Sequence, residues 1–394
     1  MKSLKLFACL LYILIVVASA FVQDSMCAET ESDPFEGVSE NPTPHPSLTK
    51  TEHFFYDNFG FRKELMSQFG SSDVSSEHGH LSSRQSAGFE FLKKFSSETK
   101  TYAAFKFQGR LVRRDGFVGS LNDSEGVKLL GNFFEYHNAY IDLYNFLDPA
   151  FSEESQSSHI GRFNARMGRF YVPFGLNLQT DTHGPVLQLS NDRNFGFERD
   201  WYAGFWGTLS EDIRYDLYYM VGSGYDLKYR GQNGLAAARL SLTNKYLFDY
   251  GWEGGLSLIG GQRLTMENLP LETSRIGFDG RYRRAIPNGL LTWTSELSGG
   301  KDSSDGVLTQ LHQLEYLHAT RHFGFITQYR WLWQDLNNIY SKVDASLFLE
   351  GTWYFRNDVG NSNLHWIKLN NEIQTSHQKG VKAVIWTLQY YWYW

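Results

Sequence analysis

The sequence predicts an all-β fold, a transmembrane antiparallel β-barrel of 16 strands with an inward-folded constriction loop. Three kinds of observation predict it: an aromatic stripe on the last segment, many half-apolar segments of about ten residues, and connections that are either short or long. Aromatic residues make up 16% of the chain, yet its mean hydropathy is −0.40. Strands that face lipid on one side and water on the other have this composition, whereas a membrane-spanning helix needs about 20 apolar residues in a row.

The first part of the chain is predicted to lie outside the barrel domain, which we assign to residues 51–394. Residues 1–20 have a basic start, a short apolar run and a small-residue cleavage site that ends at Ala20, as a secretory signal peptide does. Residues 21–50 are rich in proline, serine and acidic residues, so we expect a disordered tail on the periplasmic side. Cleavage leaves Cys27 as the remaining cysteine, which excludes an internal disulfide and a thiolate metal cluster.

Charge and motifs exclude several classes of function. The chain has 37 basic and 43 acidic residues, a balance that disfavours nucleic acid as a partner because phosphate binding needs a basic face. His78 and His80 lack a third residue at a metal-ligand spacing, and no Gly-x-Ser-x-Gly nucleophile motif occurs. Glu315 and His318 are predicted on opposite faces of a strand. We therefore expect no catalytic residue, no metal site and no cofactor.

The end of the chain, residues 384–394, alternates as a strand does. Because successive side chains of a strand point to opposite faces, one face is apolar and the other is mixed. The apolar face consists of Val384, Trp386, Leu388, Tyr390, Trp392 and Trp394. Lipid-facing strands carry aromatic residues at the membrane interface, and closing strands of bacterial outer-membrane barrels resemble this one. We expect Tyr390, Trp392 and Trp394 to contact outer-membrane lipid and the barrel-assembly machinery; a buried strand of a soluble sandwich is the alternative.

Strand-like segments follow one another along the rest of the chain. They are 86–95, 101–113, 131–145, 160–172, 200–208, 213–222, 234–243, 251–263, 273–284, 289–299, 307–319, 322–334, 342–355, 363–376 and 381–394. Bacterial single-chain barrels have an even number of strands, so one more is needed. If short connections are periplasmic turns and long ones outer loops, an outward strand within 52–69 supplies it, and 70–84 becomes the first outer loop. The other outer loops are then 114–130, 173–199 and 222–233.

Short aromatic motifs in the middle of the chain are similar to stretches of phosphate-selective porin-like outer-membrane proteins. They are Gly168-Arg169-Phe170-Tyr171-Val172-Pro173-Phe174-Gly175, Asp181-Thr182-His183, Asp200-Trp201-Tyr202-Ala203-Gly204 and Val221-Gly222-Ser223-Gly224. The resemblance implies a 16-stranded barrel, commonly a trimer, that passes small solutes and sometimes anions. Phosphate-selective members have a ladder of arginines and a lysine cluster in the pore. The inward faces predicted here mix basic with acidic residues and depart from that pattern.

Charged residues on the predicted inward faces are the candidates for a pore lining. They are Lys106, Arg110, Arg166, Arg275, Arg281, Arg283, Arg330, Asp216 and Glu350. A ring of fixed charge sets the selectivity of a pore, so the densest basic group, on strand 273–284, is the first candidate for a patch that attracts anions. The alternative is a wet lumen in which arginines and acids pair across strands.

The connection 173–199 follows the fifth strand, where the loop of general porins folds inward and narrows the channel. We expect the same here, with loop charges that act on passing solutes; a surface flap is the alternative. These charges are Asp181, His183, Asp192, Arg193, Glu198 and Arg199.

The sequence as a whole predicts an outer-membrane porin for passive diffusion of small hydrophilic solutes or ions, with anion preference as an option. The resemblance implies a homotrimer. Two alternatives stay open. An outer-membrane barrel enzyme would have about 10 to 12 strands and a serine or aspartate beside a histidine at one rim. A non-conducting adhesin or structural barrel would have long surface loops and a blocked lumen.

Overall fold

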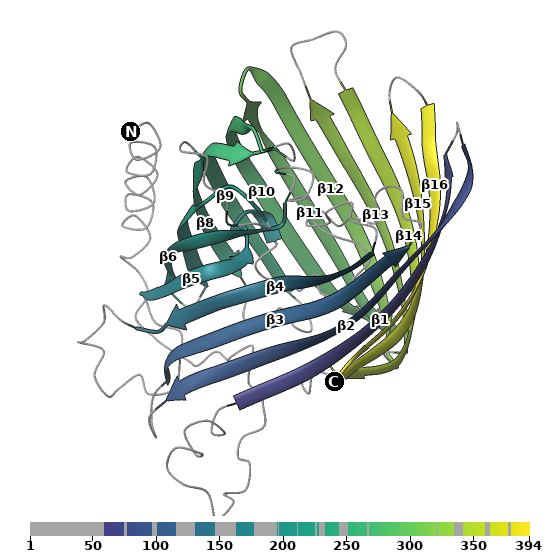
Figure 1. The fold of residues 1–394 in the computed structure, drawn as a ribbon, viewed down its shortest axis with the longest axis horizontal. Helices are drawn as coiled ribbons and strands as arrows, with labels where there is room; N and C mark the ends of the chain where they lie inside the picture. Colours follow the sequence, from purple (N-terminus) through teal and green to yellow (C-terminus); the bar gives the residue numbers. More distant parts are fainter. Residues whose placement is uncertain are drawn as a thin grey trace, which may run out of the picture.

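Sixteen antiparallel strands close into one barrel in the computed structural model of the chain, which confirms the predicted fold class (Figure 1). Neighbours in the sequence are neighbours in the wall, and β1 closes the ring against β16, from Glu64 beside Tyr393 to Val74 beside Ala383. The strands are β1 (Phe59–Val74), β2 (Glu77–Ser96), β3 (Thr101–Asp115), β4 (Gly131–Leu143), β5 (Asn164–Tyr171), β6 (Arg199–Ser210), β7 (Ile213–Met220), β8 (Gly234–Thr243), β9 (Gly251–Leu264), β10 (Pro270–Ile286), β11 (Gly289–Asp302), β12 (Asp305–His318), β13 (Phe323–Gln334), β14 (Lys342–Asp358), β15 (Asn363–Ser376) and β16 (Gly380–Tyr393).

The structure describes the wall and some of its connections. The described residues are 59–74, 77–96, 101–115, 131–145, 163–176, 195, 197–210, 212–224, 227, 233–243, 251–265, 268–320, 322–334, 342–358, 363–376 and 380–394. The predicted signal peptide and periplasmic tail, residues 1–20 and 21–50, lie outside them. Within these ranges, no helix has the length and apolarity to span a membrane.

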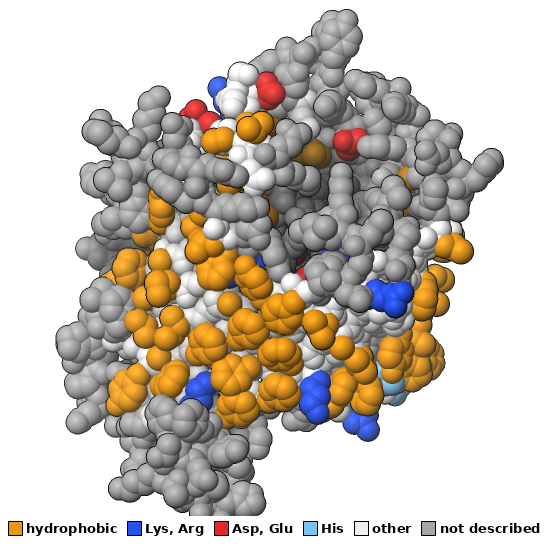
Figure 2. All heavy atoms as spheres, in the orientation of Figure 1, with side chains coloured by type: hydrophobic (Ala, Val, Ile, Leu, Met, Phe, Trp, Pro, Cys, Tyr) orange, Lys and Arg blue, Asp and Glu red, His pale blue; other side chains and the backbone are white. Residues whose placement is uncertain are grey.

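Many strands of the wall have an exposed apolar face and a buried polar face. On β16, Trp386 and Leu388 are 51% and 47% exposed, whereas Thr387 and Gln389 are buried. Figure 2 shows hydrophobic side chains gathered in a broad belt over the outside of the barrel. A closed ladder satisfies the backbone in lipid and an apolar outer face matches the acyl chains, so this wall is built to span a bilayer.

The predicted outer loop at 70–84 is wrong, because most of this segment is strand. β1 continues to Val74 and β2 begins at Glu77. Ser71 pairs with Trp386 on one side and with Leu81 on the other. The serine-rich sequence has no apolar alternation, but a ladder is formed by peptide groups and requires none.

The structure also decides the orientation of β12, which the sequence leaves open because both faces contain apolar residues. Glu315 stands beside the buried Thr292 and points inward, whereas Leu314 stands beside the exposed Trp293. His312 therefore lies on the outer face, where its Nδ1 is 3.0 Å from Oγ of Ser295.

Replacement of Leu369 by arginine tests the lipid-facing assignment. Leu369 is 49% exposed on β15, and an arginine in the middle of a lipid-facing strand costs about 2 to 4 kcal/mol. Gln313→Arg is the matched control, because Gln313 accepts a hydrogen bond from the buried Gln328 on the inner face. Denaturant unfolding from lipid vesicles should show the larger loss of stability for Leu369→Arg, and equal losses contradict the assignment.

Candidate functional site

The charged residues predicted from the sequence lie on the inner faces of their strands. Arg110, Arg166, Asp216, Arg275, Arg330 and Glu350 are buried, and Lys106, Arg281 and Arg283 are partly buried. Their strand neighbours on the opposite face belong to the outer belt, as Ile276 and Phe278 of β10 show with 44% and 56% exposure. Period-two alternation therefore placed the side chains on the correct side of the wall.

These inner charges form ion pairs, as the alternative interpretation of the sequence expects. Arg166 binds Asp142 through two hydrogen bonds of 2.7 and 2.8 Å. The remaining pairs are Lys106–Glu90 at 3.1 Å, Arg110–Glu64 at 3.1 Å, Arg275–Asp302 at 2.9 Å, Arg281–Glu253 at 3.0 Å, Arg330–Glu372 at 3.8 Å, Lys368–Glu350 at 2.9 Å and Arg214–Asp216 at 3.5 Å. Arg283 stands beside Thr292 of β11. Pairing, mostly between strands, keeps most of these charges close to an opposite one, which reduces the cost of their burial.

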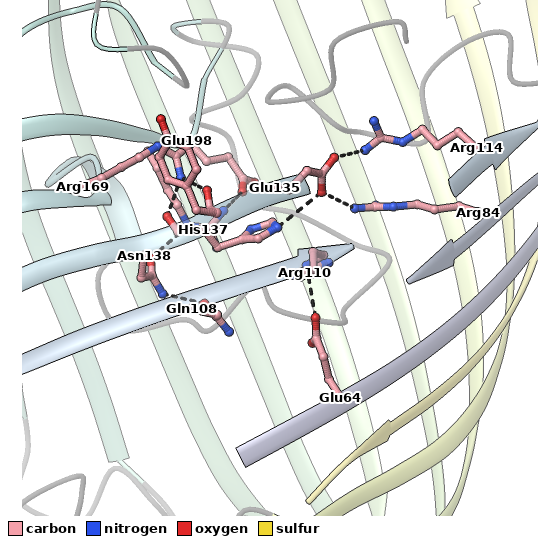
Figure 3. Close-up of polar contacts among 12 residues, drawn as sticks. Glu64, Arg84, Gln108, Arg110, Arg114, Glu135, His137, Asn138, Arg169 and Glu198 are labelled. Carbon is pink, nitrogen blue, oxygen red and sulfur yellow. Dashed lines mark hydrogen bonds and ion pairs between the residues drawn. The ribbon is translucent and has the colours of Figure 1, made fainter. Parts of the chain in front are cut away.

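A denser basic group lies on the inner face of β2, β3 and β4, and we name it the β2–β4 cluster. Arg84 and Arg114 bind the two carboxylate oxygens of Glu135, at 3.3 and 2.6 Å. Arg110 binds Glu64 at 3.1 Å in the same region of the wall (Figure 3). These three arginines face two glutamates, so the cluster carries an excess of positive charge.

Sequence reasoning missed two members of the β2–β4 cluster because it placed the strand ends wrongly. Arg84 fell in the predicted loop 70–84, and Arg114 fell at the start of the predicted loop 114–130, but the structure places them in β2 and β3. Strand ends that extend above the membrane lose their apolar alternation, and that alternation is the signal on which the assignment rests.

Two further arginines fill a gap in the wall between β4 and β5. The ladder between these strands ends at Ala139 beside Arg169. Beyond it, Nη1 of Arg169 donates hydrogen bonds to the carbonyl oxygens of Tyr136, at 2.7 Å, and His137. Arg199 Nε donates to Oδ1 of Asn138 at 3.2 Å. A guanidinium, with donors in a fixed fork, thus replaces the missing strand pairing.

The described ends of the loop after β5 lie inside the barrel, and the prediction that the rest of it folds inward concerns residues outside the described ranges. Its charged candidates Asp181, His183, Asp192 and Arg193 lie outside the described residues, but both of its ends are described and buried. Val172 N donates to the carbonyl oxygen of Glu198 at 2.8 Å, which joins the two ends at the neck of the loop.

The first limb of the loop, Pro173–Leu176, contacts the inner faces of β9, β11 and β12. Gly175 N donates to Oγ of Ser257 on β9 at 3.1 Å, and Leu176 N donates to Oε1 of Glu296 on β11 at 2.8 Å. Leu176 also packs against Leu311 of β12, and both are fully buried. Hydrogen bonds to buried side chains hold this limb in place across the interior.

Glycine is required at position 175. Its φ is +65°, in the left-handed region, and a Cβ built there would lie 2.6 Å from Oε1 of Glu296. Only glycine combines this backbone conformation with such a close approach. The contact between the limb and Glu296 therefore depends on Gly175, the last residue of the motif that begins at Gly168.

Metal binding has no candidate among the described residues, where no group of three His, Cys, Asp or Glu side chains is close enough to hold an ion. The side chains of His78 and His80 are not among those described.

Neither a family model nor a curated protein matches this chain. Its fold is similar to solved structures of bacterial outer-membrane porins. OprB of Pseudomonas putida, in a high-pH structure, has a TM-score of 0.58 and 11% identity over 88% of this chain and 96% of its own. An anion-selective porin from Comamonas acidovorans has a TM-score of 0.54 and 10% identity over 85% of this chain and 99% of its own.

OmpT is an outer membrane protein of Vibrio cholerae, and one structure of the in-vitro folded protein is described as a trimer form. This structure has a TM-score of 0.50 and 10% identity over 86% of this chain and 100% of its own. At these identities the likeness concerns the fold. The closed barrel and its apolar belt place the protein in the outer membrane.

Proposed function

We propose that the protein is an outer-membrane porin through which small hydrophilic solutes or ions diffuse passively. The observation that carries this proposal is a polar inner wall in a barrel of sixteen strands, a size at which such barrels enclose an aqueous channel. In this proposal the inner charges line the channel, and pore width and charge set rate and selectivity. Diffusion of this kind requires no cofactor.

A preference for anions is the finer part of the proposal. The excess of arginine in the β2–β4 cluster supports it, and one structurally similar protein is described as an anion-selective porin. Phosphate selectivity is not part of the proposal, because the mixed basic and acidic residues of the inner faces depart from the pattern of phosphate-selective members. The roles of Asp181, His183, Asp192 and Arg193 in a constriction also stay predictions.

The proposed functional unit is a homotrimer. The family resemblance of the motifs implies one, and a structurally similar OmpT is described in a trimer form. Contact of the exposed Tyr390 and its neighbours Trp392 and Trp394 with lipid and with the barrel-assembly machinery is part of the same proposal.

A barrel enzyme is the second candidate, and one contact bears on it. Ser295 and His312 lie within hydrogen-bond distance, as a nucleophile and its base do. They lie on the outer face in the middle of their strands, however, and not at a rim. A barrel enzyme was also expected to have about 10 to 12 strands. Both observations favour a transport protein without a catalytic role.

Conductance measurements test the porin proposal directly. The refolded protein without residues 1–20 should give stable conductance steps in planar bilayers, and its reversal potential in a KCl gradient should have the sign of chloride preference. Folding is checked first by circular dichroism and by heat-dependent gel mobility. Well-folded protein without conductance would falsify the proposal.

Neutralisation of Arg84 and Arg114 tests the origin of the anion preference. Two charges about 8 Å from a passing ion stabilise chloride and destabilise potassium by about 1 kcal/mol each in water before salt screening, so Arg84→Gln with Arg114→Gln should lower the chloride-to-potassium permeability ratio at least about fivefold. Arg113→Gln is the matched control, because Arg113 is exposed on the outer face of β3, the strand that also carries Arg114. An unchanged ratio in the double variant removes the β2–β4 cluster from the explanation.

Replacement of Glu296 tests whether the loop limb narrows the channel. A hydrogen bond to a charged acceptor is worth about 1.5 to 3 kcal/mol, so Glu296→Ala should release the limb and raise single-channel conductance. Glu296→Gln should stay close to the parent protein, because the amide oxygen still accepts from Leu176 N. Equal conductance in the alanine and glutamine variants shows that this contact does not control channel width.

A further inference from the structure

One side of the barrel interior is filled by an apolar core. Residues from both ends of the loop pack there against the inner faces of β6 to β9. The core consists of Val172, Phe174, Phe195, Phe197, Tyr202, Trp206, Tyr218, Met220, Leu235, Ala237 and Ile259. The rings of Tyr202 and Tyr218 are tilted by 47° with their centres 4.5 Å apart, and Phe174 meets Phe195 edge-on at 5.2 Å. A core packed like a protein interior has no room for water or solute.

The loop limb closes this core on the side of β9 to β12. Phe174 lies so close to β10 that a Cβ at Gly277 would be 2.6 Å from its ring. Ser257, which accepts from Gly175 N, also accepts from Nη1 of Arg239 at 3.2 Å. Arg239 is held by an ion pair with Asp279 of β10. The limb is thus bound to a part of the wall that the ion pair between Arg239 and Asp279 stabilises.

Charged residues on this side of the interior are enclosed by their neighbours. The guanidinium of Arg166 lies 4.4 Å from the ring centres of both Tyr140 and Phe170, in addition to its bonds to Asp142. Asp216 is fully buried beside Arg214. Sequence alternation marks both as inward-facing, but their surroundings are those of structural ion pairs.

The inner faces of β12 to β16 and β1 to β4 are mainly polar, apart from a buried cluster of Met66, Trp366 and Tyr391 on β1, β15 and β16. Representative side chains are Lys106, Arg110, Gln313, Glu350, Lys368 and Gln389. Of these, Lys106 and Gln313 are partly exposed. Hydrogen-bonding groups on a wall replace the lost hydration of a polar solute, which an apolar core does not do.

We propose that solutes cross the barrel along an eccentric path, confined to the side bounded by β12 to β16 and β1 to β4. The inference rests on the proposed porin function and adds the location of its path. Selectivity is then determined by charged residues on that side whose side chains are partly exposed, such as Lys106. Arg166 and Asp216, which sequence alternation also predicts as pore lining, stabilise the filled side and do not face the solute.

Cysteine accessibility tests the position of the path. In a chain with Cys9 and Cys27 replaced by serine, single cysteines are introduced by Lys106→Cys and Gln313→Cys on the polar side and by Ala237→Cys in the core. Met220→Cys is the second core variant in case Ala237→Cys does not fold. Each protein is treated in lipid vesicles with a charged methanethiosulfonate reagent. Reaction rate is read by mass spectrometry, and conductance is measured separately before and after treatment.

The expected result is fast modification with reduced conductance at positions 106 and 313. At position 237 modification should be at least about tenfold slower, because close packing excludes the reagent. Equal rates on both sides, or faster reaction in the core, overturn the eccentric path. Absence of conductance from every folded variant before treatment contradicts the porin function itself, while the modification rates still decide which side is open to water.

Discussion

A peptide group in lipid has no water to bond, so every strand of a membrane-spanning sheet needs a partner on both sides. Closure of β1 against β16 meets this requirement and determines how the rest of the wall is arranged. The ring closes at the last residue, where Lys63 and Trp394 exchange backbone hydrogen bonds of 2.8 and 3.0 Å. Once the ring is closed, each strand has one face toward lipid and one toward the interior. Period-two alternation then separates the apolar belt from the inner polar groups.

A ring of sixteen strands encloses an interior, and the side chains that face it are arranged in two ways. Around β6 to β9 it brings in the ends of a loop and builds an apolar core. Elsewhere it leaves polar side chains on the wall and pairs their charges, since an isolated buried charge is costly. The apolar core and the paired wall charges meet at Ser257, whose hydroxyl oxygen accepts hydrogen bonds from both Arg239 of the wall and Gly175 of the loop. Wall electrostatics and loop position are therefore coupled.

The parts of this structure that the sequence predicts are those in which neighbouring residues carry the signal. The alternation of Trp386, Leu388 and Tyr390 identifies the lipid face of β16, and the even-number rule locates the missing first strand. Alternation alone does not tell whether an inward side chain meets solute or other side chains, as in β7, where Tyr215, Asp216, Leu217 and Tyr218 are all buried. The contact between Leu176 and Glu296 joins residues 120 positions apart. No local pattern encodes a contact at that separation, so the bracing of the loop emerges only from the fold.

The β4–β5 seam has a consequence for the shape of the ring. Its ladder has five paired positions, from Ala139–Arg169 to Leu143–Ala165, and above them the guanidinium of Arg169 bonds the carbonyl oxygens of β4. Elsewhere, a change in circumference requires rows of peptide hydrogen bonds to break together. At this seam the row of paired peptide groups is shortest, and side-chain bonds from Arg169 and Arg199 to β4 take the place of further pairing. The ring is therefore joined by the fewest peptide pairs at the strand from which the inward loop departs.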